Sequence, residues 1–427
     1  MIDIKLIREC PELVKDNIKK KFQDKKLELV DKVIELDTKW RKEKKKVDDL
    51  RSKRNKISEQ INKLMKEKKK DEGEDLIVQA KEIPIKIDKI EVVASKLAEE
   101  IKEIMMKIPQ MIHESVPIGK GEEENIELEK IGEPVVPDFE IFNHAELAEK
   151  LNGLDLDSAR KTSGQGFYFL RGDIARLHSA ILTYAKEFMI EKGFEFCVPP
   201  YMIRSDVVSG VMSFEEMDAM MYKIEGEDLF MIGTSEHPMI GSFKNKTLIK
   251  KEMPQTLTSY SACFRKEKGA HGIEEKGLYR VHQFEKQEMI VVCEPTDSYE
   301  WYEKMLNWTV EFFRDLNIPV RKLECCSGDL ADLKAKSCDV EAWSPRQKKY
   351  FEVGSCTNME EAQARRLRIK INGGKGNYLA HTLNNTVVAS PRGLVAFMEN
   401  NQNEDGSINI PKKLQPYMGK KKVIKAN

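Results

Sequence analysis

The stretch that decides the fold is YRVHQFEKQEM, Tyr279 to Met289. Its residue types predict a β-strand, in which alternate side chains point to opposite faces. Both faces of this strand would be polar, whereas a half-buried strand normally alternates apolar and polar residues. We therefore expect one face to hold a ligand. One face would carry Arg280, His282, Phe284, Lys286 and Glu288, and the other Val281, Gln283, Glu285 and Gln287.

A second strand-like run, TLTSYSACFRKE (256–267), precedes it, and the Gly-containing loop KGAHGIEEKGL (268–278) joins the two. A strand pair built this way would bring Arg265 near Phe284 and Glu288. Two residues four positions apart on one strand face are separated by about 13 Å. That spacing suits an elongated ligand with a flat base at one end and an ammonium at the other. Arginine suits a phosphate between them, because its planar fork donates to two oxygens in parallel.

The N-terminal region has a heptad pattern, which is typical of coiled coils. Apolar residues recur from Val33 to Leu64 and again from Leu76 to Ile108, and the charged turn KEKKKDEGED (66–75) separates the two runs. We expect an antiparallel helical hairpin with helices of about 50 Å. Pro84 lies inside the second run, so we expect a kink there or a shortened first turn.

The first helix of this hairpin is strongly basic. Residues 41–70 contain fourteen basic and five acidic residues, although the whole chain has a formal net charge of zero. A basic stripe attracts phosphates, which favours an RNA-binding arm. The alternative is a scaffold or dimerisation device with a solvated charged surface.

Composition limits the class of protein. Of the 427 residues 34% are charged, and no apolar run reaches the roughly 18 residues that span a bilayer. The first residues lack the apolar stretch of a secretion signal. The eight cysteines show no CxxC spacing, so zinc ligation by Cys325, Cys326, Cys338 and Cys356 is disfavoured. These features predict a cytoplasmic protein without a membrane partner or zinc.

Beyond the hairpin the chain changes character. Residues 111–140 are rich in Pro, Gly and acidic residues and predict a linker. Residues 141–418 alternate helix-like and strand-like segments, which predicts an α+β domain with an antiparallel sheet flanked by helices. The lysine-rich segment 419–427 is expected to be a flexible basic tail.

The chain resembles the seryl-tRNA synthetases, a family of class II aminoacyl-tRNA synthetases, over nearly its whole length. MIDIKLIRE (1–9) is similar to the family's opening and RSKRNKIS (51–58) to its arm. Motif 1 is matched at 193–200 (GFEFCVPP), motif 2 at about 258–289, and motif 3 at about 386–414 within TVVASPRGLVAFMENNQNEDGSINIPKKLQPYM. The resemblance implies a homodimer and an antiparallel sheet that carries the active site. It also implies an N-terminal tRNA-binding domain (1–110) with a coiled coil.

The resemblance implies that the enzyme activates L-serine with ATP and Mg²⁺ to seryl-adenylate. It then transfers serine to the 3′ end of tRNA(Ser); whether tRNA(Sec) is also an acceptor stays open. Arg265 and Arg392 would be catalytic, and Glu352 and Ser355 would bind the Mg²⁺ ion. The serine contacts would be Thr234, Ser235, Glu236, Glu288, Asn384 and Ser390. ATP would contact Arg265, Lys266, Glu267, Val281, His282, Gln283, Phe284, Glu352, Val353, Gly354, Ser355 and Arg392. The tRNA would contact Arg51, Arg54, Lys63, Lys66, Lys68, Lys69 and Lys70.

Individual roles follow from the same resemblance. Arg265 would hold the α-phosphate and Arg392 the terminal phosphate, while Phe284 would stack on adenine near Glu267. Glu288 would bind the α-ammonium of serine, and Glu236 or Ser390 its hydroxyl. GTSEH (233–237) replaces the bacterial TAE and is closer to archaeal and eukaryotic relatives.

Two rival functions remain open. One is a carrier-protein aminoacylating relative that forms an adenylate but does not charge tRNA; the basic arm argues against it. The other is an inactive RNA-binding paralogue; the complete set of Arg265, Glu288, Glu352 and Arg392 argues against it.

Overall fold

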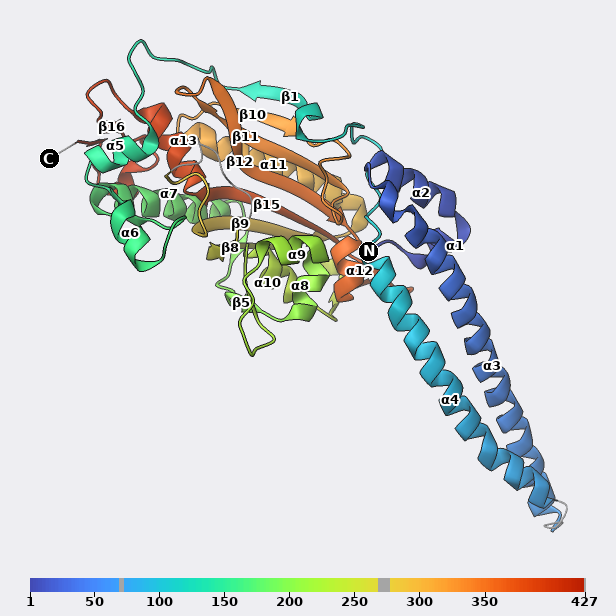
Figure 1. Cartoon of the computed structure of the whole chain (residues 1–427). Coiled ribbons are helices and arrows are strands. Elements are labelled where there is room, and N and C mark those ends of the chain that lie inside the picture. The colour runs from blue at the N-terminus through green and yellow to red at the C-terminus, as the bar shows by residue number, and fades with distance from the viewer. Residues whose placement is uncertain (69–72, 268–276, 426–427) are drawn as a thin grey trace. The chain divides into compact units, whose positions relative to one another are not determined.

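The computed structural model describes residues 1–68, 73–267 and 277–425 (Figure 1). The chain divides into two compact units. The N-terminal unit comprises Ile2–Lys19 and Gln23–Pro109, and the body comprises Met1, Lys20–Phe22 and Gln110–Asn427. The predicted positions Lys69 and Lys70, together with most of the loop 268–278, lie outside the described residues.

The N-terminal unit is built around two long helices, α3 (Leu27–Lys66) and α4 (Glu74–Met105). The heptad positions form their apolar seam, in which Val47, Ile57, Ile83 and Ile87 are buried. Ion pairs connect Lys32 to Glu100 and Arg51 to Glu91, so residues early in α3 face residues late in α4. The predicted antiparallel coiled coil is confirmed. The shorter helices of this region are α1 (Ile4–Glu9), α2 (Pro11–Lys20) and the 3₁₀ turn Asp24–Lys26.

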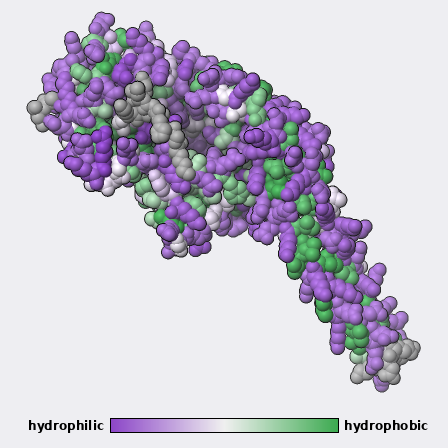
Figure 2. Space-filling view, in the orientation of Figure 1, coloured by the Kyte–Doolittle hydropathy of each residue, from purple (hydrophilic) through white to green (hydrophobic). Residues whose placement is uncertain are grey.

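The second helix of the hairpin is not shortened at Pro84. It begins at Glu74 and continues through the proline, with Ile83 and Ile87 buried on the α3 side. Apolar packing on either side of Pro84 offsets the backbone hydrogen bond that proline cannot donate. Figure 2 shows apolar side chains along the two helices between hydrophilic ones.

The body contains an eight-stranded sheet in the order β1-β10-β11-β12-β15-β9-β8-β4. All neighbours are antiparallel except β4 and β8. The predicted antiparallel sheet is confirmed. Its strands are β1 (Ile126–Ile131), β10 (Val320–Glu324), β11 (Lys336–Ser344), β12 (Lys349–Glu360), β15 (His381–Ser390), β9 (Gln283–Cys293), β8 (Gln255–Phe264) and β4 (Glu195–Phe196).

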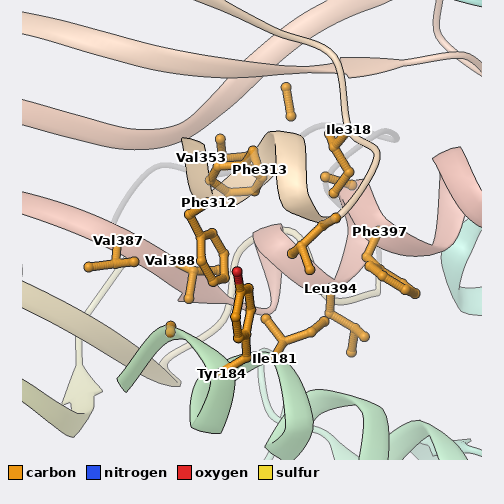
Figure 3. Packing of buried hydrophobic residues seen from close by; sticks show 14 of the residues in the cluster. Ile181, Tyr184, Phe312, Phe313, Ile318, Val353, Val387, Val388, Leu394 and Phe397 are labelled. Carbon is orange, nitrogen blue, oxygen red and sulfur yellow. The ribbon is translucent and has the colours of Figure 1, made fainter. Parts of the chain in front are cut away.

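Three helices cover one face of this sheet: α7 (Gly172–Glu191), α11 (Ser298–Asp315) and α13 (Arg392–Asn401). Their aromatic side chains build the main core, where the rings of Tyr184 and Phe312 stack with centroids 5.5 Å apart (Figure 3). Met289, Val291 and Cys293 of β9 point into this core and are fully buried. The alternate residues of β9 therefore face the other side of the sheet.

That other side is only partly covered. Ile290 and Val292 of β9 pack in a second cluster with Met239 and Ile240 of α10 (Glu236–Gly241). Phe284, Lys286 and Glu288 lie on the same face and are also buried. Further elements on the body are α5 (His144–Lys150), α6 (Leu156–Thr162), α8 (Ser205–Val211), α9 (Phe214–Met220), α12 (Ala362–Leu367) and the 3₁₀ turns Glu122–Glu124, Lys250–Glu252, Pro295–Asp297 and Gln415–Met418.

Short strands complete the body in four small sheets. They are β14-β13-β7 (Asn377–Leu379, Lys370–Asn372, Thr247–Ile249), β16-β17 (Ile408–Asn409, Val423–Ile424), β2-β3 (Leu154–Asp155, Phe169–Leu170) and β5-β6 (Met202–Ile203, Phe230–Met231). In the described part of the chain, no helix combines the length and the apolar character needed to cross a membrane.

Two sequence interpretations need correction. The segment 111–140 is not only a linker, because β1 within it pairs with β10 at the sheet edge. The segment 419–427 is not a flexible tail as far as Lys425, because β17 pairs with β16 and Ile424 is buried. Both segments are rich in charged residues, and a short pairing strand leaves little apolar signal in their sequence.

Candidate active site

The site lies on three neighbouring strands, β8, β9 and β15, on the face opposite the main core. Register places Phe284 beside Cys263, and Lys286 between Ser261 and Ala389. Glu288 lies between Ser259 and Thr386. The paired residues on β8 and β15 are small or uncharged, so the longer side chains of β9 extend beyond them on this face. The predicted row of Phe284, Lys286 and Glu288 on one face is present, although the strand begins at Gln283 rather than Tyr279.

A cavity open to solvent lies over this face, and its empty volume, which includes open solvent, is about 630 Å³. Most of the residues predicted to bind ATP line it, as do both arginines predicted to be catalytic. Its lining is Arg265, Glu267, Tyr279, Arg280, Val281, Phe284, Lys286, Glu352, Val353, Gly354, Thr386, Ala389, Ser390, Pro391 and Arg392.

Arg265 and Phe284 form one end of the cavity. The guanidinium carbon of Arg265 lies 5.1 Å from the ring centroid of Phe284, and Nε donates to the carbonyl oxygen of Gly233 over 3.2 Å. Phe284 packs against Cys263 and Val281 beneath. A flat apolar ring next to a cation offers adjacent places for a base and a phosphate.

Arg392, at the start of α13, forms a second cationic point. Its Nη1 donates to Glu352 Oε2 over 2.8 Å, and its guanidinium carbon lies 4.8 Å from the ring centroid of Tyr279. Burial lowers the pKa of Arg392, but Glu352, Tyr279 and Glu267 together outweigh burial, and the pKa is raised. Sequence reasoning did not assign Tyr279, although it is the first residue of the decisive stretch.

Glu288 lies farther along β9 and does not line the cavity. It is 1% exposed, and its Oε2 accepts a hydrogen bond of 3.1 Å from Thr234 Oγ1. The same oxygen forms an ion pair with Lys286 Nζ, and Lys286 does line the cavity. Burial raises the pKa of Glu288, and the Lys286 ammonium opposes that rise.

Glu236 is a second buried carboxyl group at this end. Gln363 Nε2 donates to its Oε1 over 2.8 Å, and Thr382 Oγ1 donates to Gln363 Oε1 over 2.7 Å. Burial and then the nearby Glu288 charge raise the pKa of Glu236 to about 7. Gln363 is fully buried and was not found from the sequence, because it lies on α12, far from the motifs.

Several buried polar atoms here have no hydrogen-bond partner within the part of the chain that the structure describes. They include Ser390 Oγ, which belongs to a cavity residue, and Asn384 Nδ2. Ser235 Oγ and His237 Nδ1 also have no hydrogen-bond partner in the described residues. Leaving a buried donor or acceptor unpaired costs about 1–3 kcal/mol, so a polar ligand that satisfies these atoms gains affinity.

The residues predicted for a metal ion, Glu352 and Ser355, lie on β12. Glu352 lines the cavity and its side chain is 47% exposed, whereas Ser355 is not part of the lining. Asp339 lies opposite Ser355 on β11, and burial together with Glu352 raises its pKa to about 7. Within residues 1–68, 73–267 and 277–425, no three His, Cys, Asp or Glu side chains gather as a metal-binding group. Oxygen donors of this kind fit Mg²⁺ that is shared with phosphates, rather than a cage made by protein alone.

The remaining predicted ATP contacts lie at the rim or behind the site. Glu267 and Val281 line the cavity, while Lys266 donates through Nζ to the carbonyl oxygen of Asp218 over 3.4 Å. His282 Nδ1 lies 3.0 Å from the carbonyl oxygen of Arg265, which indicates a structural role. Gln283 is exposed and outside the lining.

On the arm, the described candidates for RNA contact all lie on or just after α3. Arg51, Arg54, Lys63, Lys66 and Lys68 are exposed. Arg51 is partly neutralised by its ion pair with Glu91.

Comparison with known proteins gives consistent matches over the whole chain. Residues 1–112 match the N-terminal domain of seryl-tRNA synthetases, and residues 220–401 match the class II core domain of the tRNA synthetases for G, H, P, S and T. The serine–tRNA ligase of Methanocella arvoryzae is 39% identical over 421 residues, which cover 98% of this chain and 99% of that protein. The serine–tRNA ligase of Pyrococcus horikoshii is 40% identical over 447 residues, covering 99% and 98%.

Two solved structures are similar over the full length. The seryl-tRNA synthetase of P. horikoshii complexed with ATP has a TM-score of 0.93 at 39% identity and covers 100% of both chains. The cytoplasmic serine–tRNA ligase of Naegleria fowleri in complex with AMP has a TM-score of 0.88 at 33% identity, covering 100% of this chain and 99% of that one.

Proposed function

The chain belongs to the seryl-tRNA synthetase family, and we propose that it is a serine–tRNA ligase that uses ATP to attach L-serine to the 3′ end of tRNA(Ser). The observation that carries this function is the row on β9. An aromatic ring with an arginine lies at one end, and a buried carboxylate with a threonine hydroxyl lies at the other. This row matches a ligand with a purine at one end and an amine at the other.

For ATP we assign three contacts. Adenine stacks on Phe284, the α-phosphate binds Arg265, and the terminal phosphate binds Arg392 after Arg392 releases Glu352. All three residues line the cavity, which supports a single bound nucleotide. Arg265 then lies where negative charge develops during adenylate formation, and preorganised donors are most effective there.

The first step needs no protein base. The serine carboxylate is already an anion; it attacks the α-phosphorus, a P–O bond forms, and the bond to pyrophosphate breaks. In the second step, a hydroxyl of the terminal ribose of tRNA attacks the carbonyl carbon of the adenylate, loses its proton, and AMP departs. Positioning and charge stabilisation by the two arginines are what the protein supplies.

Serine is selected by buried polar groups. Glu288 and Thr234 would bind the α-ammonium, and Ser390, Asn384 and Glu236 would surround the hydroxyl. The unpaired Ser390 Oγ and Asn384 Nδ2 support this assignment. Alanine would leave these atoms unpaired, so the site would reject it more strongly than shape alone allows.

Glu352 and Ser355 would hold Mg²⁺ together with phosphate oxygens of ATP. When bound, the ion neutralises phosphate charge during transfer. The exposed Glu352 carboxylate supports this assignment, because it is accessible from the cavity.

We further propose that the basic face of α3 binds tRNA and that the enzyme is a homodimer in the cytoplasm. Apolar residues around motif 1 support the dimer. Val198 is 73% exposed and Met202 46% exposed, so both offer apolar surface that a second copy could cover.

Serine-dependent exchange of pyrophosphate into ATP, followed by charging of tRNA(Ser), tests the function. Both reactions are expected. Exchange without charging would indicate the carrier-protein relative, and no exchange with any amino acid would indicate an inactive RNA-binding paralogue.

A further inference from the structure

Lys286 is a buried cation to which the steps above give no role. It is 6% exposed and lies between Phe284 and Glu288 on the same face of β9. The spacing of a strand places it about 7 Å from each of them along the chain. Its side chain lines the cavity, pairs with Glu288 and donates to Thr386 Oγ1 over 3.4 Å.

The charges around Lys286 are unbalanced without it. Glu236 and Glu288 are both buried, and the charge of Glu288 acts on Glu236. Arg265 and Lys334 are the other cations that act on this pair of carboxyl groups. The Arg265 side chain contacts the Phe284 ring and the Gly233 carbonyl oxygen. In the proposed reaction it binds the α-phosphate of ATP. Lys286 is therefore the cation that contacts a carboxylate of the pair directly.

The contact geometry shows what Lys286 does to Glu288. Lys286 and Thr234 both bind Oε2 of Glu288, so this oxygen is fixed from two sides. In the part of the chain that the structure describes, the Thr234 hydroxyl donates to Oε2 and leaves Oε1 for other partners. A carboxylate held by one oxygen presents the other to a ligand in a defined direction.

We propose that Lys286 is a positioning residue of the serine site: it holds Glu288 as an oriented anion, so that Glu288 binds the substrate ammonium. The inference rests on the proposed function and extends it, because it gives the recognition of serine to a pair of residues rather than to Glu288 alone. Removing one partner of a buried ion pair leaves an uncompensated charge, which is costly.

The test is the pH dependence of kcat/KM for serine in pyrophosphate exchange, with the KM for ATP measured in parallel. In Lys286→Met the pKa of Glu288 should rise, since burial acts on it without the opposing ammonium. Glu288 must be ionised to bind an ammonium, so activity should fall about tenfold to a hundredfold at pH 7 and recover as the pH rises. In Lys286→Met, the acid side of the pH profile of kcat/KM (its acid limb) should move to higher pH by at least one unit. Lys286→Arg keeps the charge and should show the wild-type profile.

Lys336→Met is the matched control. Lys336 Nζ lies 3.4 Å from Glu324 Oε1 in another buried pair, outside the cavity. Its loss should lower the melting temperature and leave the pH limb in place. If Lys286→Met does not fold, Lys286→Gln, which is polar and uncharged, replaces it in the same assay.

An acid limb and a serine KM that stay at wild-type values in the folded uncharged variant would overturn the inference. A limb that shifts as far in Lys286→Arg as in Lys286→Met would also overturn it, because charge would then not be the cause. Absence of serine-dependent exchange in the wild-type protein would instead overturn the proposed function, which separates the two failures.

Discussion

Arg265 and Phe284 face each other at the end of the β8–β9 pair, with the guanidinium carbon 5.1 Å from the ring centroid. The two residues are nineteen positions apart in the sequence, and antiparallel pairing of Cys263 with Phe284 brings them together. A cation over a ring is worth about 0.5–1 kcal/mol at an exposed site. This contact keeps the guanidinium in place before a nucleotide binds.

Arg265→Ala should reduce pyrophosphate exchange by about 10²- to 10³-fold, because a preorganised donor at the α-phosphate is lost. The fold should be retained, since Arg265 follows the last residue of β8 and, within the described residues, its side chain donates one hydrogen bond, to Gly233, while its backbone bonds do not depend on the side chain. Exchange kinetics and a thermal melt check both statements. Near-normal exchange in the variant would remove Arg265 from the chemistry.

Tyr279 should matter through its ring. Arg392 lies 4.8 Å from the ring centroid, and the ring lines the cavity. Tyr279→Ala should raise the KM for ATP about fivefold to tenfold, which corresponds to a lost contact of about 1 kcal/mol. Tyr279→Phe keeps the ring and should stay within twofold of wild type. Equal effects of the two changes would assign the role to the hydroxyl.

The arm and the sheet face were predictable because both rest on periodicity. A period of 3.5 residues from Val33 to Leu64 specifies a coiled coil, and a period of two specifies the row from Phe284 to Glu288. The start of that strand was predicted too early. Residues 279–282 precede the ladder, and His282 bonds to the backbone of Arg265 instead.

Other features of the site had no sequence signal. The sequence places Lys286 on the same face as Glu288 but does not show that its ammonium reaches Glu288 Oε2. Gln363 reaches Glu236 from α12, which lies 127 positions later in the chain. Contacts of this kind depend on tertiary packing and side-chain direction, which local patterns do not encode.

Ser390→Ala should weaken the selection of serine without lowering the free energy of unfolding. Ser390 Oγ is buried and has no partner in the described part of the protein, so its removal should leave the free energy of unfolding unchanged or raise it by about 1 kcal/mol. Discrimination between serine and alanine should fall about tenfold to a hundredfold. Comparative exchange with the two amino acids checks the second statement.

Ser337→Ala is the stability control for that variant. Its Oγ is buried and lies 2.9 Å from Thr357 Oγ1, so the free energy of unfolding should fall by about 1 kcal/mol. Chemical denaturation measures both variants. A larger destabilisation by Ser390→Ala than by Ser337→Ala would show that Ser390 is structural.

Glu236→Gln should stabilise the protein increasingly as the pH rises. The pKa of Glu236 is about 7 in the fold, against 4.5 for the ordinary group. Between these values the folded protein retains a proton that the unfolded chain has lost, so the wild type loses stability as the pH rises. The loss levels off above pH 7 at about 3 kcal/mol. Glutamine cannot ionise and still accepts the hydrogen bond from Gln363.

The measurement is the free energy of unfolding of variant and wild type at pH 5 and pH 8. Glu225→Gln, at an exposed position, serves as the control and should show the same difference from wild type at both pH values. A difference for Glu236→Gln that does not grow with pH would mean that Glu236 is ionised throughout this range.

Replacing Lys63, Lys66 and Lys68 by Ser should weaken tRNA binding without changing pyrophosphate exchange. These residues lie at or just after the end of α3, and each phosphate contact contributes about 0.7–0.9 to the slope of log affinity against log salt. Losing three contacts should reduce that slope by about 2–3. Lys81, Lys89 and Lys96 on α4 are the matched control, because this helix carries many acidic residues beside them. Binding measured between 50 and 200 mM salt should show the smaller change in the α4 variant. Equal loss from both sets would assign the effect to the net charge of the arm rather than to α3.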